Sequence, residues 1–171
     1  MPVMKLTIMK KTNSGSATVN RDYAGELQAF LYAHLPLARS AGLKVDHYVD
    51  GVLQLSAPLS LNDNDKGTAF GGSLYNATVM TGWGLTSIIA KEFECSGDLV
   101  IAKADIDYLR PLREQIIARA ERPSIEMIER FKESYAKRGK ASLNQIVTVE
   151  DSKGQLCARF HGKYAIIANG Q

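Results

Sequence analysis

Hydrophobic and polar residues alternate along several stretches of the chain, with the period of two that is typical of half-buried β-strands. These stretches lie at residues 43–49, 52–58, 99–109, 113–121, 142–150 and 155–167. Asp50-Gly51, between the first two, predicts a tight hairpin turn, because both residue types tolerate the positive φ angles that such turns require. The pattern therefore predicts an antiparallel sheet built largely from hairpins.

A longer period, of three to four residues, predicts helices elsewhere. In residues 23–35 the apolar side chains fall on one helical face, and Pro36 breaks or restarts that helix. Ser124 is placed to cap a further helix, which Gly139 ends. The first 20 residues show little apolar periodicity, so we expect a loosely held arm or an extra edge strand there.

One segment differs from all the others, because residues 67–90 form a run of 24 positions without a formal charge. The run is long enough to cross a bilayer. It also contains five glycines and many threonine and serine residues, which make it too polar for a membrane span. We therefore expect a helix at residues 71–93 that is surrounded by protein. A sheet can bury such a helix by curling around it, which is the α+β hotdog arrangement; a small open α/β sandwich is the alternative.

Composition narrows the class of protein. A length of 171 residues fits one domain, and we divide it into an arm at 1–21 and a domain at 22–171. The net charge of +3 is too small to indicate nucleic-acid binding unless it is clustered. Two cysteines, with no CxxC or Cys/His cluster, predict neither a disulfide framework nor a metal site, and we expect no cofactor. With no signal-peptide pattern, the expected location is cytoplasmic.

Residues 64–75, which read NDKGTAFGGSLY, are the most informative stretch of the chain. Adjacent glycines at a helix start expose backbone N–H groups that no Cβ shields. A helix N-terminus also carries partial positive charge, which suits an oxyanion that develops on a carbonyl. Alternatively, Gly71 and Gly72 allow the helix to pack closely on the sheet, and their spacing alone does not separate the two interpretations.

This stretch resembles the loop of the hotdog-superfamily thioesterases, which reads Asn-x-x-Gly-x-x-His-Gly-Gly before the central helix. The segment Tyr108-Leu109-Arg110-Pro111 is similar to the strand-ending motif of the same superfamily. The string GTAFGGSLYNATVMTGWGL, at 67–85, is most similar to the thioesterase domain at the C-terminus of YiiD-type proteins. The resemblance covers about residues 22–168. It implies a homodimer, or a dimer of dimers, that acts on acyl-CoA or acyl carrier protein.

The resemblance carries over part of a catalytic site. It matches Asn64 to the loop asparagine that positions water or the thioester carbonyl. It matches Gly71 and Gly72 to the pair whose neighbouring N–H groups polarise that carbonyl. Phe70 stands where histidine is usual, and Val79 stands where one large subgroup carries its catalytic carboxylate. The matched base is therefore absent, although attack by water on a thioester generally needs one.

Asp107 is the best substitute for that base, because superfamily sites lie near this strand; the alternative is a solvent-facing strand residue. Asp63 and Asp65 flank Asn64 and are better explained as solvated loop carboxylates. A buried Asn76 needs a hydrogen-bond partner, and we expect that partner to be structural. The remaining predicted substrate-binding residues are Asn62, Thr68, Phe70, Ser73, Tyr75 and Arg110.

The sequence thus predicts an acyl-thioester hydrolase that acts on acyl-CoA or acyl carrier protein. The alternative, favoured by the absence of a carboxylate at Val79, is a module that binds acyl thioesters without hydrolysing them. A hotdog dehydratase is a weaker choice, because the site loop contains no histidine.

Overall fold

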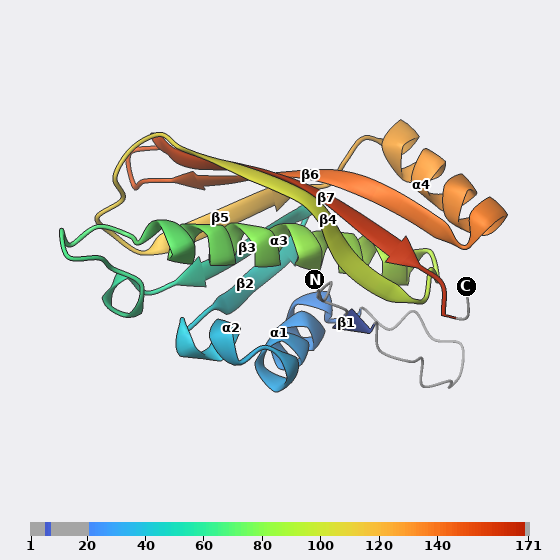
Figure 1. Cartoon of the computed structure of the whole chain (residues 1–171), viewed down its shortest axis with the longest axis horizontal. Helices are drawn as coiled ribbons and strands as arrows, with labels where there is room; N and C mark the ends of the chain where they lie inside the picture. The colour runs from blue at the N-terminus through green and yellow to red at the C-terminus, as the bar shows by residue number, and fades with distance from the viewer. Residues whose placement is uncertain (1–5, 8–20, 170–171) are drawn as a thin grey trace.

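A computed structural model describes residues 6–7 and 21–169 of the chain. Seven strands form one antiparallel sheet in the order β1-β4-β7-β6-β5-β3-β2, and this sheet curls around one long helix, α3 (Figure 1). The strands are β1 (Leu6–Thr7), β2 (Lys44–Val49), β3 (Val52–Ala57), β4 (Asp98–Tyr108), β5 (Ile116–Glu121), β6 (Lys140–Glu150) and β7 (Leu156–Ile167). The helices are α1 (Tyr23–His34), α2 (Pro36–Ser40), α3 (Gly71–Glu92) and α4 (Ile125–Arg138), with a short 3-10 turn at Leu59–Leu61. The predicted α+β hotdog arrangement is confirmed.

Helix α3 is buried along most of its length, although it contains many polar residues. Sixteen of its 22 residues are buried. Three of its threonine hydroxyls donate to the carbonyl one turn earlier, from Thr78 to Leu74, Thr81 to Ala77 and Thr86 to Gly82, at 2.8 to 2.9 Å. Since these polar groups are satisfied inside the helix, apolar side chains of the sheet can surround it. Over residues 6–7 and 21–169, no helix combines the length and hydropathy that a membrane crossing requires.

The hairpin between β2 and β3 has the predicted turn. Asp50 and Gly51 have φ angles of 50° and 78°, and Val49 pairs with Val52 across the turn. Positive φ at both central residues matches the twist of the flanking strands.

One prediction about β4 is wrong. Strict alternation over residues 99–109 predicts that Val100 and Ala102 share one face with Ala104, Ile106 and Tyr108. A β-bulge between Ile101 and Lys103 inserts one extra residue, which exchanges the two faces of the strand. Before the bulge, Leu99 and Ile101 stand opposite buried β7 residues and face inward. Periodicity alone does not reveal a bulge.

Two boundaries also differ from the sequence pattern. Strand β5 begins at Ile116 rather than at residue 113, because Pro58 follows the end of β3 and leaves the preceding residues without a strand to pair with. Leu6 and Thr7 pair with Leu99 and Asp98 as a short edge strand. The rest of the expected arm, residues 1–5 and 8–20, lies outside the described part of the chain.

Two potential edges of the sheet are covered. Strand β5 pairs with β6 only between residues 118–120 and 147–149, and α4 packs against the remaining half of β6. At the far side, the Gln28 side chain of α1 accepts from the Val45 N–H (2.7 Å) and donates to the Leu43 carbonyl (3.4 Å). Among the described residues, β4 beyond Leu99 has no strand on its outer side.

We expect Gly82→Ala to destabilise the fold. A Cβ at this position would lie 2.5 Å from the hydroxyl oxygen of Tyr164, which is fully buried and donates to the Val79 carbonyl at 2.8 Å. Overpacking of this kind costs roughly 1–3 kcal/mol, and alanine returns about 1 kcal/mol in helix propensity. Urea denaturation should therefore show a net loss of unfolding free energy. The matched control is Gly72→Ala, whose Cβ meets only the exposed Phe70 ring and should cause no loss; equal losses would contradict this packing account.

Candidate functional site

Two backbone N–H groups at the start of α3 have no acceptor. The first residues of the helix are Gly71 and Gly72, and neither N–H bonds to any described residue. Phe70, just before the helix, provides no side-chain cap, and its carbonyl accepts from Ser73 and Leu74 instead. The partial positive charge of a 22-residue helix is concentrated at these two donors. The site can therefore stabilise negative charge on an oxygen.

The structure also shows why glycine at these positions is not explained by packing. A Cβ on Gly71 would touch Tyr108 at 3.4 Å, which is ordinary van der Waals contact. The three atoms nearest to a Cβ on Gly72 would all belong to the ring of Phe70, the first at 2.4 Å. This side chain is 55% exposed and can rotate away. Neither glycine has a positive φ angle. Close packing on the sheet thus does not require this pair, which favours the interpretation that a ligand approaches the backbone here.

Asn62 holds the loop that leads into α3. Its buried side-chain amide donates to the carbonyls of Ala41 and Pro58, both at 2.8 Å. The backbone carbonyl of Asn62 accepts from the Phe70 N–H at 2.7 Å. Both amide hydrogens are therefore used inside the protein. The structure does not bring this predicted substrate-binding side chain to the free donors.

Asn64 and Thr68 close the tip of the same loop on each other. The Asn64 oxygen accepts from the Lys66 and Thr68 N–H groups, at 2.9 and 3.2 Å, and its amide nitrogen donates to the Thr68 hydroxyl at 3.0 Å. Gly67, at φ 65°, makes the turn possible. These hydrogen bonds restrict the loop tip to one conformation. The catalytic role of Asn64 stays a prediction.

Tyr108 is a site residue that the sequence reasoning missed. Its hydroxyl donates to the Gly71 carbonyl at 3.0 Å, and burial raises its pKa, so that the donor proton is kept at neutral pH. The contact fixes the end of β4 against the start of α3. Tyr108 belongs to the strand-ending motif of the sequence. The motif alone did not indicate that the Tyr108 hydroxyl contacts the start of α3.

Asp107, the neighbour of Tyr108, lies on the opposite face of β4. It is exposed and stands opposite Arg159 of β7, on the face turned away from α3. The carboxylate is therefore not brought to Gly72 within one chain. It can serve such a site only in an assembly with a second copy.

The face of α3 that carries Gly72 also carries Asn76 and Val79, four and seven residues further on. Asn76 is only 7% exposed, and its side-chain amide, which reaches solvent, makes no hydrogen bond with any described residue. We expected a structural partner for this amide, and the described residues provide none. On this face an unpaired amide, rather than a carboxylate, therefore lies nearest in sequence to the two donors.

The other predicted residues lie around the same end of α3. Ser73 is half-buried in the first turn. Tyr75 is partly exposed and packs edge-on against Phe160, with ring centroids 5.7 Å apart. Arg110 donates to the Leu156 carbonyl at 2.9 Å, so its guanidinium is partly used on β7. Within residues 6–7 and 21–169, no cluster of three or more His, Cys, Asp or Glu side chains is arranged to hold a metal ion.

The fold and the glycine pair at the helix start define a protein of the hotdog class. The family model YiiD_C, described as "Putative thioesterase (yiiD_Cterm)", matches residues 24–168. The chain belongs to this family.

Solved structures agree with that assignment. A protein of unknown function from Chlorobaculum tepidum TLS is 32% identical, with a TM-score of 0.82 over 85% of this chain and 94% of its own. A "putative thioesterase" from Shewanella oneidensis is 29% identical, with a TM-score of 0.76 over 85% of this chain and 97% of its own. The thioesterase HI1161 from Haemophilus influenzae, at 14% identity and a TM-score of 0.67 over 96% of this chain and 97% of its own, shares the fold.

We expect Asn62→Ala to reduce stability rather than catalysis directly. The substitution leaves two carbonyl oxygens, of Ala41 and Pro58, without their donor, and an unsatisfied buried group costs about 1–3 kcal/mol. Chemical denaturation should show this loss. Asn64→Ala, in a more exposed part of the loop, is the comparison and should cost less. A loss for Asn64→Ala that equals or exceeds that for Asn62→Ala would contradict the assigned structural role.

Proposed function

We propose that this chain is a thioesterase that hydrolyses acyl thioesters of coenzyme A or acyl carrier protein at the start of α3. The observation that carries the proposal is the pair of unpartnered N–H groups at Gly71 and Gly72. A thioester carbonyl oxygen placed on these donors would become negatively charged as water attacks the carbon. The donors and the helix charge stabilise that oxyanion. The carbon–sulfur bond then breaks, and the thiolate takes up the proton that water has lost.

We propose that Asn64 orients the reacting water or carbonyl, as the superfamily resemblance implies. Its amide oxygen already accepts two backbone N–H groups, so the loop has little freedom and would hold its position during the reaction. Thr68, Phe70, Ser73 and Tyr75 would line the approach to the glycine pair. Of the four, Phe70 and Tyr75 offer large exposed rings for the acyl chain.

Assembly into a homodimer would complete the proposed site. The outer side of β4 beyond Leu99 is unpaired within the described residues, and an unpaired edge is a ready template for pairing with a second copy. Pairing of two β4 strands would bring Asp107 of the second copy toward the loop that leads into α3. Under this proposal Asp107 replaces the base that is missing at Val79. Arg110, at the same strand end, would contact the phosphates of coenzyme A or the carrier arm.

A second function is supported by one observation. The α3 face that carries Gly72 holds Asn76 and Val79 and no carboxylate. A site with oxyanion donors but no base can hold an acyl thioester without hydrolysing it. This observation favours a non-hydrolytic acyl-thioester-binding module as the alternative function.

The two cysteines support a cytoplasmic location. Cys95 and Cys157 are buried free thiols, and burial raises the pKa of both. Thiols in this state persist where the surroundings are reducing.

Gly72→Val is the first test of the site. We expect it to abolish binding or turnover of acyl thioesters, because a β-branched side chain blocks the carbonyl's approach to the backbone donors. The only clash that its Cβ makes is with an exposed ring, so stability should change little. Turnover is measured by mass spectrometry on a panel of short, long and carboxyl-bearing acyl-CoA and acyl carrier protein thioesters. Thermal unfolding measures the stability of the same variant. Stability and activity lost in equal measure would instead support the packing interpretation.

Asn64→Ala and Asp107→Asn test the mechanism. If the amide and the carboxylate act in the transition state, each variant should lose on the order of 100-fold in rate while thioester affinity stays nearly unchanged. Single-turnover kinetics and equilibrium binding separate the two effects. Rates like the parent's in both variants would show that the site is misplaced. A parent that binds acyl-CoA and never releases free acid would establish the binding module instead.

A further inference from the structure

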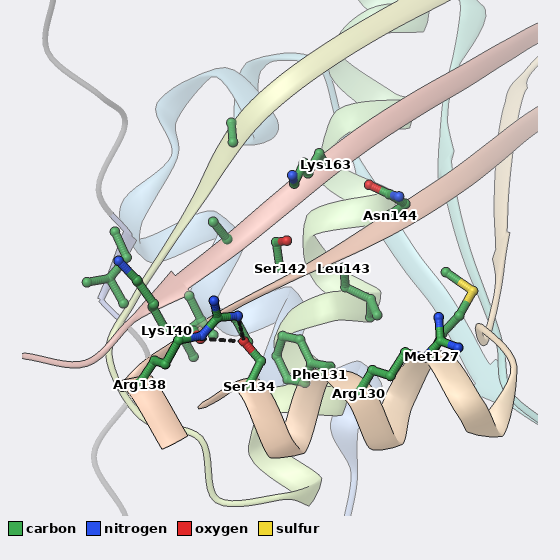
Figure 2. Close-up of a pocket in the computed structure, with 15 residues that line it drawn as sticks. Met127, Arg130, Phe131, Ser134, Arg138, Lys140, Ser142, Leu143, Asn144 and Lys163 are labelled. Carbon is green, nitrogen blue, oxygen red and sulfur yellow. Dashed lines mark hydrogen bonds between the residues drawn. The ribbon is translucent and has the colours of Figure 1, made fainter. Parts of the chain in front are cut away.

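A hollow of about 640 Å³ lies between α4 and the strands β6 and β7 (Figure 2). Neither Gly71 nor Gly72 lines it. Its position is at the end of the molecule where β7 finishes and β6 begins (Figure 1). In Figure 2 Met127 and Arg130 stand at one end of the hollow, Arg138 and Lys140 stand at the other, and Lys163 lies on the strand side. The volume is in the range of sites that hold a small organic molecule.

The charged groups around this hollow are all positive. Its lining includes Arg130, Arg138, Lys140 and Lys163 and no carboxylate. Within the described part of the chain, none of these four side chains forms an ion pair, and Arg138 donates only to the Ser134 hydroxyl at 2.5 Å. Glu126 lies one turn before Arg130 on α4 and interacts electrostatically with it. Glu126 does not line the hollow. An anion would therefore meet four cations that are not already neutralised by ion pairs.

The sheet places one further positive charge beside the hollow. Lys103 of β4 stands directly opposite Lys163 of β7 in the register. Like charges in directly opposed positions destabilise a sheet. A second hollow, of about 370 Å³, is lined by both lysines and by Asp105, and it adjoins the first through Asn144 and Lys163. The repulsion between Lys103 and Lys163 opposes folding, and an anion bound beside Lys163 would reduce it.

The floor of the hollow is apolar. Phe131 and Leu143 are buried beneath it, and Met127 and Ile167 line it with partly exposed side chains. An inorganic ion would leave this surface in water. A ligand that carries an apolar group next to its charge would cover it, since burial of apolar area is favourable.

We propose that the hollow binds a small amphiphilic anion, a phosphate or carboxylate head on an apolar chain. The head lies between Arg130 and Lys163, and the chain extends toward the exposed side chain of Ile167. The N-terminal segment of this protein does not fit the same surface, because residues 1–20 contain three lysines and no carboxylate. The site is independent of the function proposed at the other end of α3.

Isothermal titration of the full chain with octyl phosphate, beside inorganic phosphate and octyl glucoside, tests this proposal. We expect saturable binding of octyl phosphate that weakens with salt, and at least tenfold weaker binding of the other two. Lys163→Gln and Arg130→Gln should each weaken octyl phosphate binding roughly tenfold, since each removes one charge-assisted contact. The control Lys153→Gln, in an exposed turn, should change nothing.

Two more variants separate this site from the proposed active site. Ser142→Trp fills the hollow from an exposed position without removing a charge and should abolish binding, whereas Gly72→Val should leave binding intact. Thermal unfolding checks that each variant is folded. Binding lost in Gly72→Val and kept in Ser142→Trp would overturn the proposal. Equal binding of octyl glucoside, or tighter binding of a polyglutamate peptide than of octyl phosphate, would also overturn it, and the second result would assign the surface to an acidic protein.

Discussion

The burial of α3 on nearly all sides is the constraint on which the rest of the structure depends. The helix carries no charge from its start to Lys91, and its threonines bond to the helix's own carbonyls. A helix of this kind exposes no face that water must solvate, so the sheet can close around it. At its N-terminal end, the N–H groups of Gly71 and Gly72 have no acceptor among the residues that the structure describes. The same constraint thus produces the curled sheet and leaves two donors for a ligand.

Much of this fold follows from the sequence, for local reasons. The uncharged run predicts a buried helix, and Asp50-Gly51 predicts a turn whose φ angles the structure shows. The bulge in β4 was missed because an extra residue leaves no trace in composition, and only the pairing with β7 reveals it. Local sequence patterns therefore predict elements whose geometry depends on their own residues. Features that depend on a distant strand require the structure.

The candidate site shows the same division. The sequence located the glycine pair correctly in a helix start, but it could not decide how each polar side chain is used. Asn62 and Asn64 looked alike, yet one holds the carbonyls of Ala41 and Pro58 and the other closes its own loop. Conversely, Asn76 was expected to have a structural partner and has none among the described residues. Hydrogen-bond partners from distant segments decide these roles, and sequence spacing does not encode them.

The covered sheet edges bear on how many copies can join. Gln28 occupies the Val45 N–H and the Leu43 carbonyl at the β2 side, and α4 packs against the half of β6 that does not pair with β5. Among the described residues, the outer side of β4 beyond Leu99 has no strand. A sheet open on both sides could add neighbours without end and grow into a filament. A sheet open on one side accepts a single neighbour related by a twofold axis, and its capacity is then exhausted. The Gln28 side chain of α1 therefore occupies two backbone groups that an added strand would otherwise use at the start of β2.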